Sequence, residues 1–165
     1  MTISKLKKSD NRQVAPLIQQ LTKNIVKPDK LLERIKNLTD QENSRFLVVK
    51  KDNRAVGIGG LVWYYIPSKG LVGWIEEVVV DSEYRNQGIG QKILQELLKL
   101  AVAKNLKQVK LTSSNPIAKH IYQKLGFAKK EEDLFIFPGR PPGPPKGGDE
   151  CQPGAPLASG AKGKT

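Results

Sequence analysis

The stretch from Tyr84 to Lys92, "YRNQGIGQK", decides how this chain is interpreted. It follows a valine-rich segment, residues 78–80, and it opens a run in which apolar residues recur every three or four positions. Two glycines at a helix start let the backbone approach a ligand, and the N–H groups of a first helical turn attract anions. The stretch therefore predicts an anion, such as a phosphate group, held where a helix begins.

The glycine turn by itself is a weak signal, because such a turn can serve helix packing alone. A full dinucleotide-binding motif is absent, since Ile93 occupies the place of its last glycine. A Walker loop is absent as well, because no G-K-[ST] follows the turn. The residues around the turn have to decide which anion it holds.

Hydrophobic periodicity predicts the order βααβββαβαβ, with one further strand at the end left open. The first helix is expected to begin with Ser9 or Asp10 as its N-cap. The glycine-rich segment 57–60 is interpreted as a strand that accommodates close packing. The expected strands are 2–8, a hairpin over 44–66, 70–81, 106–114 and 127–137, and the expected helices are 9–24, 27–40, 88–105 and 116–126.

Two motifs together give the chain a family resemblance. Residues 85–90, "RNQGIG", fit the pattern Q/R-x-x-G-x-G/A, and Asn115, Ala118, Tyr122 and "KLGF" at 124–127 fit a second pattern further along. In this combination the chain resembles the GNAT superfamily of acetyl-CoA-dependent N-acetyltransferases. The resemblance covers the order of elements from the first residue to about residue 137. It implies an α/β, GNAT-like fold: a mixed, mostly antiparallel central sheet flanked by about four helices, opening between the fourth and fifth strands.

Composition divides the chain into a folded part, residues 1–138, and a tail, residues 139–165. The tail holds six prolines and seven glycines and little apolar surface, so we expect it to be disordered. The single cysteine, Cys151, lies in it, which argues against a disulfide, a zinc cluster or a buried cysteine nucleophile. The start has no apolar signal segment, and the apolar run 61–66 is too short to span a bilayer. We expect a cytoplasmic protein with no metal and no membrane partner.

The formal net charge is +12, which favours anionic partners. Without the tail's four cations and two anions the folded part carries 24 − 14 = +10. Nucleic acid and a phosphorylated cofactor are both candidates. The lysines are scattered, and no nucleic-acid motif accompanies them, so a nucleic-acid partner is disfavoured.

The resemblance implies acetyl-CoA as co-substrate, with its pyrophosphate at the glycine turn. The peptide-like pantetheine arm is expected to pair with the edge of the preceding strand at a bulge. Asn115 is expected to cap the following helix, with Pro116 in its first turn, and to touch the cofactor. The predicted cofactor-binding residues are Val78, Val79, Val80, Arg85, Asn86, Gln87, Gly88, Ile89, Gly90, Gln91 and Asn115.

Acetyl transfer to an amine needs a group that accepts the amine proton and a group that protonates the leaving thiolate. By the resemblance Tyr122 is the candidate acid; a core tyrosine is the alternative. Glu76 and Glu77 interrupt an apolar strand and are the candidate bases, unless they merely pair with surface lysines. Strand alternation places them on opposite faces, and Glu76 is favoured. Some family members carry the acidic base at the position where this chain has Lys110, so a base at that position is excluded. His120 is expected to be a partly exposed helix residue.

The sequence thus predicts an enzyme, an acyltransferase that moves an acetyl group directly to a primary amine. The amine can belong to a small molecule or to a protein, and residues 22–30 are expected to line its side of the site. Two alternatives stay open: an acyl-CoA-binding GNAT-like regulatory module without efficient turnover, and a basic nucleic-acid-binding protein. A homodimer also stays open.

Overall fold

The computed structural model describes residues 1–22, 24–113 and 115–131. The chain divides into a unit from Met1 to Ala128 and a second unit that begins at Lys129. Of the second unit three residues are described, and in it the Lys129 ammonium pairs with the Glu131 carboxylate at 2.5 Å. The predicted tail, the boundary at residue 138 and most of the closing strand expected over 127–137 lie outside the described residues, while residues 127–131 of that segment are not in a strand.

The first unit is built on one mixed sheet with the strand order β1-β2-β3-β4-β5. Strands β1 to β4 pair antiparallel, and β5 pairs parallel to β4. This architecture confirms the predicted α/β, GNAT-like fold. The strands are β1 (Thr2–Lys5), β2 (Ser44–Lys51), β3 (Arg54–Ile66), β4 (Gly70–Val80) and β5 (Gln108–Lys110). The helices are α1 (Asn11–Gln19), α2 (Pro28–Thr39), α3 (Ile89–Ala103) and α4 (Pro116–Lys124), with short 3₁₀ turns η1 (Lys8–Asp10) and η2 (Ser82–Tyr84).

Local sequence explains the hairpin and the long helix. Asp52 and Asn53 both have positive φ, as the tight turn between β2 and β3 requires, and these residue types tolerate that conformation. The apolar stripe predicted for α3 is its buried face. The buried residues of α3 are Ile89, Ile93, Leu94, Leu97 and Ala101.

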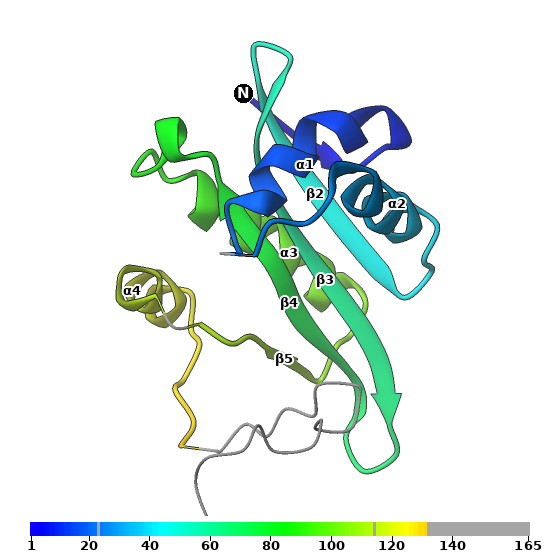
Figure 1. The fold of residues 1–165 in the computed structure, drawn as a ribbon. Coiled ribbons are helices and arrows are strands. Elements are labelled where there is room, and N and C mark those ends of the chain that lie inside the picture. The colour runs from blue at the N-terminus through cyan, green and yellow to red at the C-terminus, as the bar shows by residue number, and fades with distance from the viewer. Residues whose placement is uncertain (23, 114, 132–165) are drawn as a thin grey trace, which may run out of the picture. The chain divides into compact units, whose positions relative to one another are not determined.

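The sheet carries a core on each face. Helices α1 and α2 cover one face and α3 lies on the other (Figure 1). The glycines of β3 let both layers approach closely: a Cβ on Gly59 would lie 2.6 Å from Ile93 Cγ2, and one on Gly60 would lie 2.3 Å from Phe46 Cε1. The prediction that residues 57–60 form a closely packed strand is therefore confirmed.

The sheet opens between β4 and β5. The two strands are paired only at Val72–Gln108, Gly73–Val109 and Trp74–Lys110. Beyond Trp74, β4 continues to Val80 while β5 ends, and Figure 1 shows the two chain segments diverging toward α4. The predicted opening is thus confirmed, and it leaves the outer edge of β4 from Ile75 onward without a strand neighbour among the described residues.

Asp10 corrects one expectation. It occupies the N-cap position of α1, but its side chain makes no capping hydrogen bond to that helix. Its carboxylate is buried and accepts hydrogen bonds from the Lys50 ammonium at 2.5 Å and from the Lys7 backbone N–H at 3.0 Å. The side chain therefore ties the start of α1 to β2. In the part of the chain described here, no helix is long and apolar enough to cross a bilayer.

Candidate active site

The predicted anion site is the start of α3. Gly88 is the N-cap in the left-handed conformation, with φ of 73°, and contributes no side-chain cap. The first helical hydrogen bond runs from Lys92 N–H to Gly88 O at 3.0 Å. The N–H groups of residues 89–91 precede it and have no acceptor within the helix. No acidic residue lies in this first turn, so the helix start presents N–H groups and positive potential to an anion.

The loop before α3 is held by Arg85 together with side chains that the sequence did not single out. Gln20, at the C-cap of α1, accepts a hydrogen bond from the Arg85 guanidinium at 3.3 Å. Arg85 Nε also donates to the Val80 carbonyl at 3.1 Å. Asp81, which is buried, pairs with Arg54 at 3.1 Å. Arg85 was predicted to contact the cofactor, and in the structure its guanidinium supports the loop.

The other loop residues leave the backbone accessible. Asn86 and Gln87 are exposed, and Asn86 has a positive φ of 60°. A Cβ on Gly90 would lie 3.6 Å from Val80 Cγ2, which is ordinary contact, so the fold itself does not require glycine there. Gly88 and Gly90 place no side chain over the backbone of this loop, which is what a phosphate cradle needs.

A bulge in β4 lies at the two glutamates. The register pairs Gly60 with Glu76 and Ile58 with Val79, so Gly59 alone opposes both Glu77 and Val78. Glu77 has a positive φ of 54°, which is uncommon for a residue with a side chain. The bulge predicted by the family resemblance is present, and it lies on the part of β4 that β5 leaves unpaired.

The bulge overturns the prediction that Glu76 and Glu77 face opposite sides of the sheet. Ile75 belongs to the core on the α3 face, and Val78 packs against that same core. A regular strand would place Ile75 and Val78 on opposite faces, because they are three residues apart. The alternation is therefore interrupted between these two residues, at the glutamates. Both carboxylates are exposed. Neither glutamate forms an ion pair with a described lysine.

The surroundings of Glu77 make its carboxyl group a stronger proton acceptor. Desolvation by surrounding protein raises the pKa of Glu77, and the nearby charge of Glu76 raises that pKa further. A carboxylate with a raised pKa is a better proton acceptor than an ordinary surface glutamate. Perturbed carboxyl groups of this kind are frequent where proton transfer takes place.

The three valines present backbone rather than side chains to the opening. Val79 is buried in the core on the α1/α2 face, while Val78 and Val80 pack against the core on the α3 face. Their inner backbone edge pairs with β3, and their outer edge has no strand partner among the described residues. A peptide-like arm can pair with such an outer edge, and this pairing stays a prediction of the family resemblance.

Tyr122 is held by the way α4 ends. Gly126 has φ of 90°, its N–H donates to the Gln123 carbonyl at 3.0 Å, and the Phe127 N–H donates to the Tyr122 carbonyl at 3.0 Å. This pair of bonds is a Schellman cap. The Phe127 ring meets the Tyr122 ring edge-on, with centroids 6.1 Å apart. The "LGF" of the motif therefore fixes the last turn of the helix that carries Tyr122.

The remaining candidates lie near this helix or on β5. The Asn115 carbonyl accepts from Lys119 N–H at 3.3 Å, so Asn115 stands at the N-cap position and Pro116 begins α4, as predicted. His120 is exposed on α4. Lys110, in the place of an acidic residue, lies with its ammonium 5.8 Å from the centre of the Trp74 ring.

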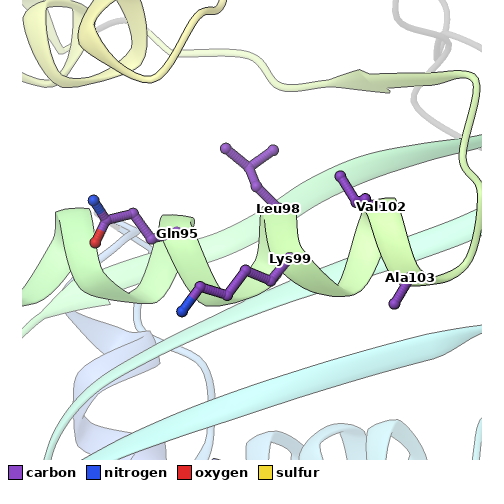
Figure 2. Close-up of a pocket in the computed structure, with 5 residues that line it drawn as sticks. All are labelled: Gln95, Leu98, Lys99, Val102 and Ala103. Carbon is purple, nitrogen blue, oxygen red and sulfur yellow. The ribbon is translucent and has the colours of Figure 1, made fainter.

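Two hollows on the described surface are lined by residues other than the glycine turn, the glutamates and Tyr122. The larger, about 680 Å³, runs along α3 and is lined by residues between Gln95 and Ala103 (Figure 2), away from the start of that helix. It contains none of the predicted residues. The smaller, about 390 Å³, lies between α1 and α2, and Ile25, Val26 and Pro28 line it together with Arg12 and Gln19. It includes part of the segment expected to face the acceptor. No group of three potential metal ligands occurs among the described residues.

Comparisons with known proteins agree with this geometry. A sequence model of the acetyltransferase (GNAT) family matches residues 15–127. Glucosamine 6-phosphate N-acetyltransferase 1 of Dictyostelium discoideum is 28% identical over 130 residues, which are 76% of this chain and 82% of that protein.

Solved structures share the fold. Glucosamine-6-phosphate N-acetyltransferase from Arabidopsis thaliana has a TM-score of 0.70 at 24% identity, covering 82% of this chain and 97% of that one. A predicted acetyltransferase from Clostridium acetobutylicum, whose crystal structure contains acetyl-CoA, has a TM-score of 0.70 at 17% identity, covering 82% of this chain and 95% of that one. The family match includes the glycine turn, the bulge and α4.

Proposed function

The chain belongs to the acetyltransferase (GNAT) family and is an N-acetyltransferase, and we propose that it uses the opening between β4 and β5 to transfer an acetyl group from acetyl-CoA directly to a primary amine. The observation that carries this proposal is the bulge of β4, whose two carboxylates lie on the part of that strand that β5 leaves unpaired. The uncapped start of α3 and the capped helix that carries Tyr122 support the proposal.

The residues present fit acetyl-CoA. The N–H groups from Asn86 to Gln91 suit a pyrophosphate, and no carboxylate stands in the first turn of α3 to repel it. The outer edge of β4 at Val78–Val80 suits the amide groups of pantetheine. When bound, this co-substrate supplies the acetyl thioester.

The protein's own groups supply proton transfer and charge stabilisation. We assign Glu76 as the group that takes the proton of the acceptor amine, directly or through water, and Glu77, whose pKa is raised, is the alternative base beside it. A backbone N–H freed by the bulge can stabilise negative charge on the reacting carbonyl oxygen. Tyr122 donates a proton to the departing thiolate. No covalent enzyme intermediate is needed, so the chemistry requires no nucleophilic side chain.

The acceptor is an amine, and glucosamine 6-phosphate is the first acceptor to test because relatives carry that name. We further propose a cytoplasmic location, because a charged co-substrate such as acetyl-CoA does not cross membranes freely. A homodimer is a further proposal, which sedimentation would decide.

The alternatives predict other behaviour. An acyl-CoA-binding regulatory module would bind CoA and release almost no thiol with any amine. A nucleic-acid-binding protein would bind with an affinity that falls steeply with salt and would not need CoA.

The test compares Glu76→Gln, Glu77→Gln and Tyr122→Phe in thiol-release assays with a panel of amines. Glu76→Gln keeps the shape of the side chain but removes the base, so turnover should fall by about 100-fold or more. Tyr122→Phe should lower turnover less. Calorimetry should show that all three variants still bind acetyl-CoA.

Two outcomes would change the assignment. Full activity in Glu76→Gln together with loss in Glu77→Gln would transfer the role of base to Glu77. Full activity in all three variants would show that catalysis depends on positioning alone or on other groups.

A further inference from the structure

The part of the sheet beside the bulge carries two aromatic rings and a lysine, the Trp74 platform (Tyr64, Trp74 and Lys110). Its members come from the adjacent strands β3, β4 and β5. The Trp74 indole N–H donates to the Tyr64 hydroxyl at 3.0 Å, and the Lys110 ammonium lies 5.8 Å from the centre of the Trp74 ring. These contacts hold both rings and one cation together on the surface of the sheet.

The platform shares a face with Glu76. In the β3–β4 register Trp74 opposes Val62 and Glu76 opposes Gly60. Val62 packs against the core under α1 and α2, and a Cβ on Gly60 would meet Phe46 of that core. Directly opposed residues of an antiparallel pair point to the same side, so Trp74 and Glu76 both lie on the α1/α2 face.

The spacing suits one small molecule. Glu76 is two residues beyond Trp74 on β4, a distance of about 6.6 Å along the strand. Lys110 opposes Trp74 on the next strand. A carboxylate that attracts an amine and an ammonium that attracts an anion therefore lie about one sugar ring or one short carbon chain apart.

The platform is accessible to a ligand. Tyr64 is 43% exposed, and Trp74 and Lys110 are half-buried. Helices α1 and α2 lie over another part of this face (Figure 1). Among the described residues Lys110 forms no ion pair, whereas Lys50 is paired with Asp10. A half-buried ammonium has lost some of its hydrating water. The hydrogen bonds of an anionic ligand would take the place of that water.

We infer that the Trp74 platform is an anion-binding subsite of the acceptor site and that the acceptor is a primary amine that also carries a phosphate or carboxylate group. Lys110 binds the anion, the rings of Trp74 and Tyr64 pack against the carbon skeleton, and the amine lies at Glu76. This inference rests on the proposed acetyl transfer and narrows its substrate class.

The experiment measures kcat/KM with saturating acetyl-CoA for two matched acceptor pairs. Glucosamine 6-phosphate and glucosamine differ by a phosphate, and lysine and cadaverine differ by a carboxylate. The wild-type protein should prefer the anionic member of at least one pair tenfold or more. The pair that shows the preference identifies the anion.

Lys110→Met removes the charge and keeps a stem of similar shape over Trp74. It should lower the preference ratio at least tenfold, mainly by raising KM for the anionic acceptor, and Lys110→Arg should restore most of it. The matched control is Lys104→Met. The Lys104 ammonium lies 4.2 Å from the centre of the Trp63 ring, whose side chain belongs to the core on the opposite face of the sheet. This control removes the same charge and a similar contact, and it should leave the ratio unchanged.

Calorimetric titration of each variant with glucosamine 6-phosphate and with lysine, in the presence of CoA, separates binding from turnover. Acetyl transfer without preference for either anionic acceptor would overturn the subsite and leave the acetyltransferase function standing. A preference ratio in Lys110→Met that is unchanged from the wild type would do the same. Binding that needs Lys110, but without acetyl transfer, would uphold the subsite and refute the proposed function. Neither binding nor transfer would refute both.

Discussion

Gly88 is the residue on which the anion site depends most directly. Its left-handed conformation turns the chain into α3, and nothing lies within 4 Å of the position of a Cβ there. A side chain would therefore project from the helix start without a clash. It would reach the space in which we place the pyrophosphate.

We predict that Gly88→Asp binds CoA at least tenfold more weakly than Gly88→Asn, a difference of about 1.4 kcal/mol. The two side chains have nearly the same shape, and both tolerate positive φ, so the comparison isolates the negative charge. Isothermal titration calorimetry measures both affinities. Equal affinities in two folded variants would show that the pyrophosphate lies elsewhere.

Glu77 combines an unusual backbone conformation with a raised pKa. A carboxyl group with a raised pKa binds its proton more tightly in the folded state. Folding therefore becomes less favourable as pH rises from the ordinary pKa of 4.5 through the higher pKa of the folded state. Below this window both states are protonated and the cost is absent. The charge at Glu77 therefore slightly destabilises the protein at neutral pH.

We predict that Glu77→Gln raises the melting temperature at pH 7 and that this gain disappears below pH 4.5. The matching rise in the free energy of unfolding should be no more than about 0.5 kcal/mol, because the side chain remains in contact with water. Differential scanning calorimetry at pH 4 and pH 7 measures it, with the exposed Glu42→Gln as control. A gain independent of pH would mean that the charge is not its cause.

At the scale of elements, the ends of the helices position the site. Helix α3 starts without a side-chain cap, which leaves its N–H groups for a ligand. Helix α4 ends in a complete Schellman cap, which fixes the turn of Tyr122. Helix α1 is connected to the sheet by Asp10 and Gln13, and Gln20 at its C-cap reaches the loop that carries Arg85.

Asp10 provides the prediction at this scale. Burial raises its pKa, but the hydrogen bonds from Lys50 and the Lys7 N–H outweigh burial, so the pKa lies below the usual 3.8. A lowered pKa means that the carboxylate stabilises the fold above pH 3.8 and that this contribution is lost as pH falls through the folded value. The charged form therefore contributes fully at neutral pH.

We predict that Asp10→Asn lowers the free energy of unfolding by about 2–3 kcal/mol at pH 7. This loss is somewhat smaller than the loss from breaking a fully buried ion pair, because Lys50 is partly exposed. Urea unfolding measures this loss, which should shrink below pH 3.8. The control is Asp40→Asn, because Asp40 pairs with Lys8 at 3.0 Å in an exposed position. This control should change the stability little. A similar loss in both variants would contradict the role given to burial.

At the scale of the whole molecule, the sequence separates the folded part from the segment 139–165. We predict that truncation after Pro138 leaves the melting temperature and the CoA affinity unchanged, because the removed segment has little apolar surface to bury. Thermal denaturation and calorimetry of the two forms measure this. A loss of several degrees would show that the segment contributes to the fold.

The sequence by itself determined the family, the order of elements from β1 to α4 and the glycine turn. These are local properties: periodicity sets helix and strand, Gly88 permits the N-cap conformation, and "LGF" supplies a helix cap. Such signals survive in the sequence because each depends on residues a few positions apart.

Only the tertiary structure decided where the side chains meet. The bulge that interrupts the alternation at Glu77 arises from the register of β4 against β3, and no periodicity reveals it. Asp10 forms its ion pair with Lys50, forty residues away, instead of capping its own helix. Tyr64, Trp74 and Lys110 come together only because three strands pair in one register. Contacts across strands depend on register, and register is set by packing of the whole sheet rather than by neighbours in the chain.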